Sequence, residues 1–131
     1  MSGLSVKQLT SSHYEGWLNL YKHYAEFYNT SLSNTGTKTT WGWLIETNHP
    51  CTGIVVLEEN LLVGLAHFRE MPSLLRGANI GFLDDLFVMP ERRGGKVVSL
   101  LIDELKKEAK EKNWAIIRWI TKDNNYRARN L

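Results

Sequence analysis

One stretch of the sequence carries most of the residues that are able to do chemistry. It runs from Phe82 to Leu101 and places a glycine- and arginine-rich turn between an apolar segment and an amphipathic one. A helix that starts directly after such a turn presents unpaired backbone N–H groups and the positive end of its dipole, and both favour a phosphate. The turn adds the cations Arg92, Arg93 and Lys96. From the residues alone, two interpretations stay open: a site for a phosphate-bearing ligand, or a glycine turn with solvated cations.

Two adjacent acidic residues, Asp84 and Asp85, precede this turn. Neighbouring side chains on a strand point to opposite faces of a sheet, so we expect only one of the two to face a cleft. The sequence favours neither over the other. A carboxylate here is suited to removing a proton from an amine, because an alkylamine of pKa near 10.4 is only about one part in two thousand neutral at pH 7.

The elements that must position these residues follow from hydrophobic periodicity and from turn signals. A hairpin turn is expected at Glu59-Asn60, and loops are expected at 29–40, 71–77 and 90–95. The pattern predicts, in chain order, a strand at 4–8, helices at 14–28 and 41–46, strands at 54–58, 61–69 and 80–89, a helix from Val97, a strand at 114–121 and the start of a helix at 124–131. Runs of adjacent strands predict an α/β (α+β) fold with a mixed, mostly antiparallel sheet flanked by helices.

The turn and its flanks resemble the acetyl-coenzyme A motif of the GNAT superfamily of N-acetyltransferases. Members of that family have a strand ending V-x-P, two spacer residues and then [Q/R]-x-x-G-x-[G/A], which opens a helix that continues to L-[L/I]. Val88-Met89-Pro90 matches the strand end, Arg93 takes the leading position, and Leu100-Leu101 falls where the helix buries itself.

The resemblance extends to both ends of the chain. Asn125-Tyr126-Arg127-Ala128 is similar to the N-x-x-A that opens the family's last helix, and Glu15–Tyr28 is similar to the first helix of the small yeast histone and polyamine acetyltransferases and their bacterial relatives. The resemblance implies one GNAT-like domain over residues 1–131. It also implies transfer of an acetyl group from acetyl-CoA, as co-substrate, to a primary amine of a small molecule or a protein.

The resemblance also implies roles for individual residues. Asp84 or Asp85 takes the amine proton, directly or through water, and the backbone near Leu86 and Val88 polarises the thioester carbonyl and holds the pantetheine arm. The positions that it assigns to the coenzyme are Leu86, Phe87, Val88, Arg92, Arg93, Gly94, Gly95, Lys96, Val97, Val98, Ser99 and Asn125.

Two positions depart from the family's glycine motif. Lys96 and Val98 stand where the family has small residues that let backbone amides approach the pyrophosphate. A hydrogen bond to a charged group contributes about 1.5–3 kcal/mol. Losing two of them predicts coenzyme binding weaker by about a hundredfold or more, unless Lys96 and the arginines compensate.

The end of the chain also departs from the family. The sequence stops at Asn130-Leu131, where the family has a tyrosine that often protonates the departing thiolate, and the final strands are missing as well. The strand at 114–121 would then lack a neighbour, and an open strand edge invites pairing with another chain. We therefore expect either a homodimer that completes the sheet or a naturally shortened gene product.

Composition excludes several other classes of protein. Sixteen Lys and Arg against fourteen Asp and Glu leave a net charge of +2, too small to hold a nucleic acid by charge alone. No apolar run reaches the roughly 18 residues of a membrane helix, and no secretion signal opens the chain, so we expect a cytoplasmic protein without nucleic-acid or membrane partners. No metal is expected, because the histidines have no ligand spacing. These are His13, His23, His49 and His67, which we interpret as surface or partly buried residues without a role.

Two further hypotheses remain beside the enzyme. One is a non-catalytic GNAT-like domain that acts as a binding or assembly module, and the other is a sensor that binds the coenzyme without turnover. Trp41 and Trp43 are expected to be packing residues, with an aromatic wall of the acceptor site as the alternative. Cys51 lacks an evident base, so a nucleophilic role is not expected.

Overall fold

A six-stranded sheet with the strand order β1-β2-β3-β4-β5-β6 forms the centre of the molecule. The computed structural model describes residues 3–93, 95–120 and 126–130. The strands are β1 (Leu4–Gln8), β2 (Cys51–Glu58), β3 (Leu61–Ser73), β4 (Ala78–Val88), β5 (Ile116–Ile120) and β6 (Tyr126–Asn130). Neighbouring strands are antiparallel except β4 and β5, which are parallel. The predicted mixed, mostly antiparallel sheet is confirmed.

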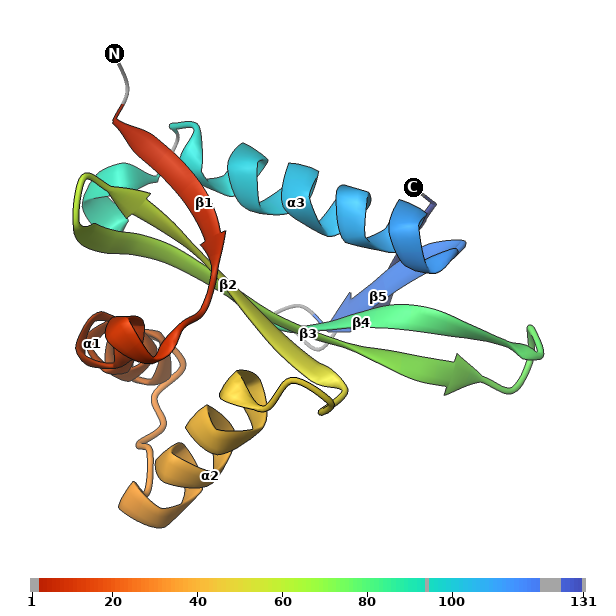
Figure 1. The fold of residues 1–131 in the computed structure, drawn as a ribbon, viewed down its shortest axis with the longest axis horizontal. Coiled ribbons are helices and arrows are strands. Elements are labelled where there is room, and N and C mark those ends of the chain that lie inside the picture. Colours follow the sequence, from red (N-terminus) through yellow and green to blue (C-terminus); the bar gives the residue numbers. More distant parts are fainter. Residues whose placement is uncertain (1–2, 94, 121–125, 131) are drawn as a thin grey trace.

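Helices cover both faces of this sheet (Figure 1). α3 (Val97–Lys112) lies on one face, and α1 (Tyr14–Phe27) and α2 (Asn34–Ile45) lie on the other. Each face has its own apolar core. Val97, Leu101 and Leu105 pack into the core under α3, whereas Trp17 and Leu44 anchor the core under α1 and α2.

The apolar stripe predicted from Val97 onward is the buried face of α3. Val97, Leu101, Leu105 and Ala109 are each at most 2% exposed. The helix can approach the sheet closely because β3 has a glycine beneath it: a Cβ on Gly64 would lie 2.6 Å from Cγ1 of Val97. This contact fixes where the helix begins relative to β3.

α2 begins seven residues earlier than the sequence predicted, at Asn34 instead of Trp41. The serine- and threonine-rich segment was expected to be a loop, but Ser33 caps the helix by accepting a hydrogen bond from the backbone N–H of Gly36 at 2.9 Å. The Thr37 hydroxyl then donates to the Ser33 carbonyl at 2.7 Å. Thr37 is buried, so tertiary packing outweighs the low helix propensity of this segment.

The predicted loop at 71–77 is also shorter than expected. β3 continues through Met71 and Pro72 to Ser73, and it pairs with β4 as far as Ala78. The strand prediction ended at Arg69, where β2 stops pairing with β3. The pattern of a single sequence does not reveal that β4 remains paired with β3 after β2 has ended.

The predicted terminal helix is wrong for the described part of that segment. Residues 126–130 form β6, which pairs antiparallel with β5, with Arg118 opposite Ala128. β5 therefore has a strand neighbour on each side, which removes the unpaired β5 edge that motivated a homodimer. Asn125, which the resemblance assigned to the pantetheine arm, lies outside the described residues.

None of the helices in the described ranges is both long enough and apolar enough to cross a membrane.

The close contact between Gly64 and Val97 predicts the effect of one substitution. Gly64→Ala is expected to lower the free energy of unfolding by about 1–3 kcal/mol, because the added methyl group must displace a buried, β-branched side chain. Gly42→Ala in α2 is the matched control, since a Cβ there meets nothing within 4 Å. The control should stabilise the protein by about 0.5–1 kcal/mol, the usual helix preference for alanine. Equal effects of both variants in urea unfolding would contradict the close packing of α3 on β3.

Candidate active site

A β-bulge in β4 brings Asp84 and Asp85 to the same face of the sheet. His67 lies opposite Asp85 and Phe68 lies opposite Leu83, so Asp84 is the extra residue. Before the bulge, Leu83 packs into the core under α3; after it, the odd-numbered Phe87 packs into the core under α1 and α2. The alternation of side chains between the two faces of the sheet is thus inverted at Asp84. The expectation that the two carboxylates point to opposite faces is wrong for this reason.

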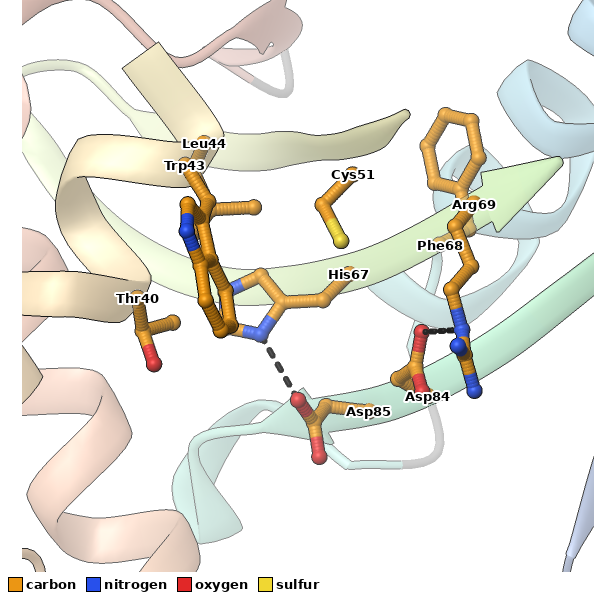
Figure 2. Close-up of a pocket in the computed structure, with 9 residues that line it drawn as sticks. All are labelled: Thr40, Trp43, Leu44, Cys51, His67, Phe68, Arg69, Asp84 and Asp85. Carbon is orange, nitrogen blue, oxygen red and sulfur yellow. Dashed lines mark hydrogen bonds and ion pairs between the residues drawn. The ribbon is translucent and has the colours of Figure 1, made fainter. Parts of the chain in front are cut away.

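Both carboxylates line one pocket of about 280 Å³ beside α2 (Figure 2). The carboxylates come from β4, the facing side chains from β3, and the opposite wall from α2 and the start of β2. The lining residues are Thr40, Trp43, Leu44, Cys51, His67, Phe68, Arg69, Asp84 and Asp85. Trp43 is 46% exposed, and this fits the alternative of an aromatic wall better than a packing residue.

Asp85 is held by a chain of buried hydrogen bonds. The indole Nε1 of Trp17 donates to Nε2 of His67 at 2.9 Å, and Nδ1 of His67 lies 2.8 Å from Oδ2 of Asp85. Because an indole N–H can only donate, Nε2 must be the acceptor and the imidazole proton is on Nδ1, from which it is donated to the carboxylate. The Tyr21 hydroxyl also donates to Oδ2, at 3.4 Å. His67 is thus a neutral donor that fixes the orientation of Asp85.

These contacts shift the pKa values of the groups around Asp85. Burial by itself raises the pKa of this carboxyl, but the hydrogen bonds that it accepts from His67 and from the hydroxyls of Tyr24 and Tyr21 outweigh burial, so the pKa lies below its ordinary value. Burial and the Asp85 charge raise the pKa values of Tyr21 and Tyr24. Asp85 is therefore ionised at neutral pH and attracts cations.

Asp84 has a different environment. Its Oδ2 lies 3.2 Å from Nε of Arg69, whose guanidinium carbon stands 5.0 Å from the centre of the Phe82 ring. Burial raises the pKa of the Asp84 carboxyl, and the Asp85 charge adds to that effect, while Arg69 offsets only part of it. Of the two carboxylates, Asp84 is thus the better proton acceptor.

A second pocket lies on the opposite face of the sheet, where β4 and β5 separate. The two strands pair only between Gly81–Leu83 and Ile117–Trp119, and within the described ranges no strand pairs with that edge of β4 beyond Leu83. The pocket encloses about 610 Å³. Its walls are Leu83, Gly95, Val98, Ser99, Ile102, Asp103, Leu105, Lys106, Ile117 and Trp119.

The start of α3 opens into this second pocket. Its first helical hydrogen bond runs from Leu100 N to Lys96 O, and no side chain caps the helix. The N–H groups of Val97, Val98 and Ser99 precede that bond and lie at the positive end of the helix dipole, which favours an anion. Val98 itself is 39% exposed and lines the pocket.

Two of the three expected cations have other partners. Arg92 forms an ion pair with Glu58. Arg93 donates from Nε to the Val88 carbonyl at 3.1 Å and lies over the rings of Phe27 and Phe87. Arg92 thus ties the turn to β2, and Arg93 ties it to β4 and α1. Lys96 is exposed at the helix start, and Gly94 lies outside the described residues.

The two pockets approach each other at the bulge. Leu83 lines the pocket under α3, whereas the next two residues, Asp84 and Asp85, line the pocket beside α2. A ligand that enters from each face would therefore meet the other at the same point of β4. This arrangement suits a transfer reaction between two substrates.

Comparison with known proteins identifies the family. The model of the acetyltransferase (GNAT) family matches residues 17–131. The chain belongs to the GNAT family. It is therefore an acyltransferase, and the fold and family expected from the Val88–Leu101 motif are confirmed.

Individual relatives agree with this assignment. This GNAT acetyltransferase is 24% identical over 128 residues to the D-amino-acid N-acetyltransferase HPA3 of Saccharomyces cerevisiae, covering 96% of this chain and 80% of that protein. Its fold is similar to that of the aminoglycoside N-acetyltransferase AAC(6')-Iy in complex with CoA (TM-score 0.78, 18% identity, 92% of this chain and 78% of that one). It is also similar to the ribosomal-protein-alanine N-acetyltransferase of Brucella melitensis biovar Abortus 2308 (TM-score 0.69, 20% identity, 88% and 78%).

Sequence reasoning missed three side chains that contact the two carboxylates of this acetyltransferase: His67, Tyr21 and Arg69. His67 was interpreted as a residue without a role, yet it is 4% exposed and bonded on both ring nitrogens. One signal was present, since His67 interrupts the longest apolar run of the sequence. A polar residue in a buried strand needs partners, but the sequence does not say which ones.

The two carboxylates should respond in opposite ways to replacement by asparagine. The pKa of Asp84 is raised in the folded state, so the native protein binds more protons there and stability falls as pH rises through the window above about 3.8. Asp84→Asn should therefore be more stable than the wild type at pH 7 and similar to it at pH 3. The pKa of Asp85 is lowered, so its contribution to stability is present at pH 7 and is lost as pH falls below about 3.8.

Asp85→Asn should accordingly be less stable than the wild type at pH 7, with a difference that shrinks toward pH 2. Urea unfolding followed by fluorescence between pH 2 and 7 measures both variants. If the two variants shift stability at pH 7 in the same direction, the opposed environments assigned to the two carboxylates are wrong.

Proposed function

We propose that this GNAT acetyltransferase moves an acetyl group from acetyl-CoA to a primary amine of a small molecule or protein. The observation that supports it best is the bulge of β4, at which the pocket beside α2 and the pocket under α3 approach one another with Asp84 and Asp85 between them. The CoA complex of AAC(6')-Iy, which shares the fold, supports the choice of donor.

In this proposal the coenzyme occupies the pocket under α3. The diphosphate lies against the N–H groups of Val97–Ser99 with Lys96 beside it, and the pantetheine arm follows the free edge of β4 near Leu86 and Val88. Backbone N–H groups of that edge polarise the thioester carbonyl. Arg92 and Arg93 serve the turn itself, which they tie to Glu58 and to the Val88 carbonyl.

The acceptor amine enters the pocket beside α2. Asp85, ionised and oriented by His67, attracts the ammonium form, and Asp84 accepts its proton directly or through water. The neutral nitrogen then attacks the thioester carbon, the C–N bond forms, the C–S bond breaks, and the nitrogen releases its second proton to solvent as the amide forms. The departing thiolate has an ordinary pKa near 8.5, so it leaves as the thiolate or takes a proton from water.

Coenzyme titration followed by a turnover assay tests this proposal. Isothermal calorimetry should show acetyl-CoA binding, and an amine panel should give release of free thiol. Asp84→Asn should lower kcat by about 10²–10⁴-fold while coenzyme affinity changes little. Coenzyme binding without thiol release would favour the sensor, and the absence of binding would favour the assembly module.

The side chain at position 98 provides a separate test of the coenzyme pocket. Val98→Ala should tighten acetyl-CoA binding, because it removes a branched side chain beside the N–H groups of the helix start while keeping a good helix former. Leu74→Ala is a suitable control, since Leu74 is 95% exposed on the β3–β4 hairpin. A weaker Val98→Ala complex would mean that Val98 supports the coenzyme instead of crowding it.

A homodimer stays a prediction, now with β6 as the edge strand that a second copy would extend. Light scattering at several protein concentrations should give twice the mass of 15.1 kDa. A monodisperse monomer would exclude pairing through that edge.

A further inference from the structure

The acceptor pocket beside α2 contains a cation as well as two carboxylates. We infer that the acceptor amine carries an anionic group close to its nitrogen, as an α-amino acid does, and that Arg69 binds this anion. The inference rests on the proposed acetyl transfer and specifies its substrate class.

The charges that line the pocket set this preference. Asp84 and Asp85 are its acidic residues and Arg69 is its cation, while His67 is neutral because it accepts from Trp17 and donates to Asp85. The sum is one negative charge, which a single ammonium group balances. A polyamine would place a second ammonium group near the arginine without a carboxylate to receive it.

The guanidinium of Arg69 is held in place by two contacts that leave its terminal N–H groups available. Its Nε faces Asp84 at 3.2 Å, and its guanidinium stands over the Phe82 ring at 5.0 Å. Within the part of the chain that the structure describes, neither terminal nitrogen has a hydrogen-bond partner. The side chain is 43% exposed and lines the pocket. Figure 2 shows its guanidinium beside Asp84, with the terminal nitrogens beyond the ion pair. A guanidinium with both terminal nitrogens available matches a carboxylate in a bidentate manner.

The spacing of these charges favours a short acceptor. Because Arg69 and Asp84 are in contact, their complement is a molecule whose ammonium and carboxylate groups are also neighbours. The apolar side chains of Trp43 and Leu44 form the wall on the α2 side. A volume of about 280 Å³ suits a single small molecule with an apolar side chain rather than a large polycation.

Matched acceptors that differ only in the carboxylate test this inference. Thiol release from acetyl-CoA is measured with phenylalanine (each enantiomer), phenylalaninamide and 2-phenylethylamine, with leucine and leucinamide as a second set, and with 1,4-diaminobutane. For the wild type, kcat/KM should be about tenfold or more higher for one amino acid than for its amide or for the diamine.

Substitution of Arg69 should then remove that preference. Arg69→Gln should lower the ratio of kcat/KM for the amino acid to kcat/KM for its amide by about ten- to a hundredfold, beyond any change common to all acceptors that follows from loss of the ion pair with Asp84. Arg69→Lys should fall between, because it keeps the charge but loses the bidentate geometry. Arg76→Gln is the matched control, since Arg76 is an exposed arginine outside the pocket, and it should leave all rates unchanged.

The outcomes distinguish failure of the substrate class inferred here from failure of the proposed acetyl transfer. Equal or greater rates with the amines that lack a carboxylate, or a uniform loss in Arg69→Gln across all acceptors, would overturn the inference and leave acetyl transfer intact. Absence of thiol release from every acceptor would overturn acetyl transfer itself.

Discussion

The extra residue at Asp84 is the constraint on which the arrangement of the site depends. A regular β4 would send one carboxylate toward α3 and the other toward α2. The bulge places both on the α2 face and returns Phe87 to the core under α1 and α2, so the strand remains buried on both faces. Beyond the bulge, β4 remains paired with β3 along one edge, but its pairing with β5 along the other edge has ended at Leu83. Both substrates can therefore reach the same point of the sheet.

The buried network around Asp85 shows how the fold holds an ionised group inside the molecule. Trp17 is fully buried, and its indole N–H is satisfied by the hydrogen bond that it donates to His67. His67 transmits that orientation to the carboxylate, which is therefore favoured in its charged form. Asp84 lacks such support, and its charge is unfavourable in the folded state. The pair thus combines a fixed anion with a proton acceptor, each defined by its surroundings.

On the opposite face, close packing positions the helix start. The contact between Gly64 and Val97 seats the first turn of α3 against β3, and Arg93 ties the preceding turn to the Val88 carbonyl at the end of β4. The arginines that a sequence pattern assigns to a phosphate thus hold the loop in shape. In the proposed complex, the N–H groups of the helix start and Lys96 contact the ligand. The arginines thus hold the turn, and the helix start opens into a pocket although the turn lacks the family's small residues.

Periodicity and the V-x-P-x-x-R motif are local signals, and they were enough to predict the class of the sheet, a helix at 14–28, a helix from Val97, the hairpin at Glu59-Asn60 and the family. Tertiary structure decided the rest. Capping by Ser33 and the burial of Thr37 made a helix of a threonine-rich segment, and pairing with β5 made a strand of residues 126–130. The bulge at Asp84, the partners of His67 and the place of Arg69 depend on the register between β3 and β4. That register is a non-local property, which a linear pattern of residues does not encode.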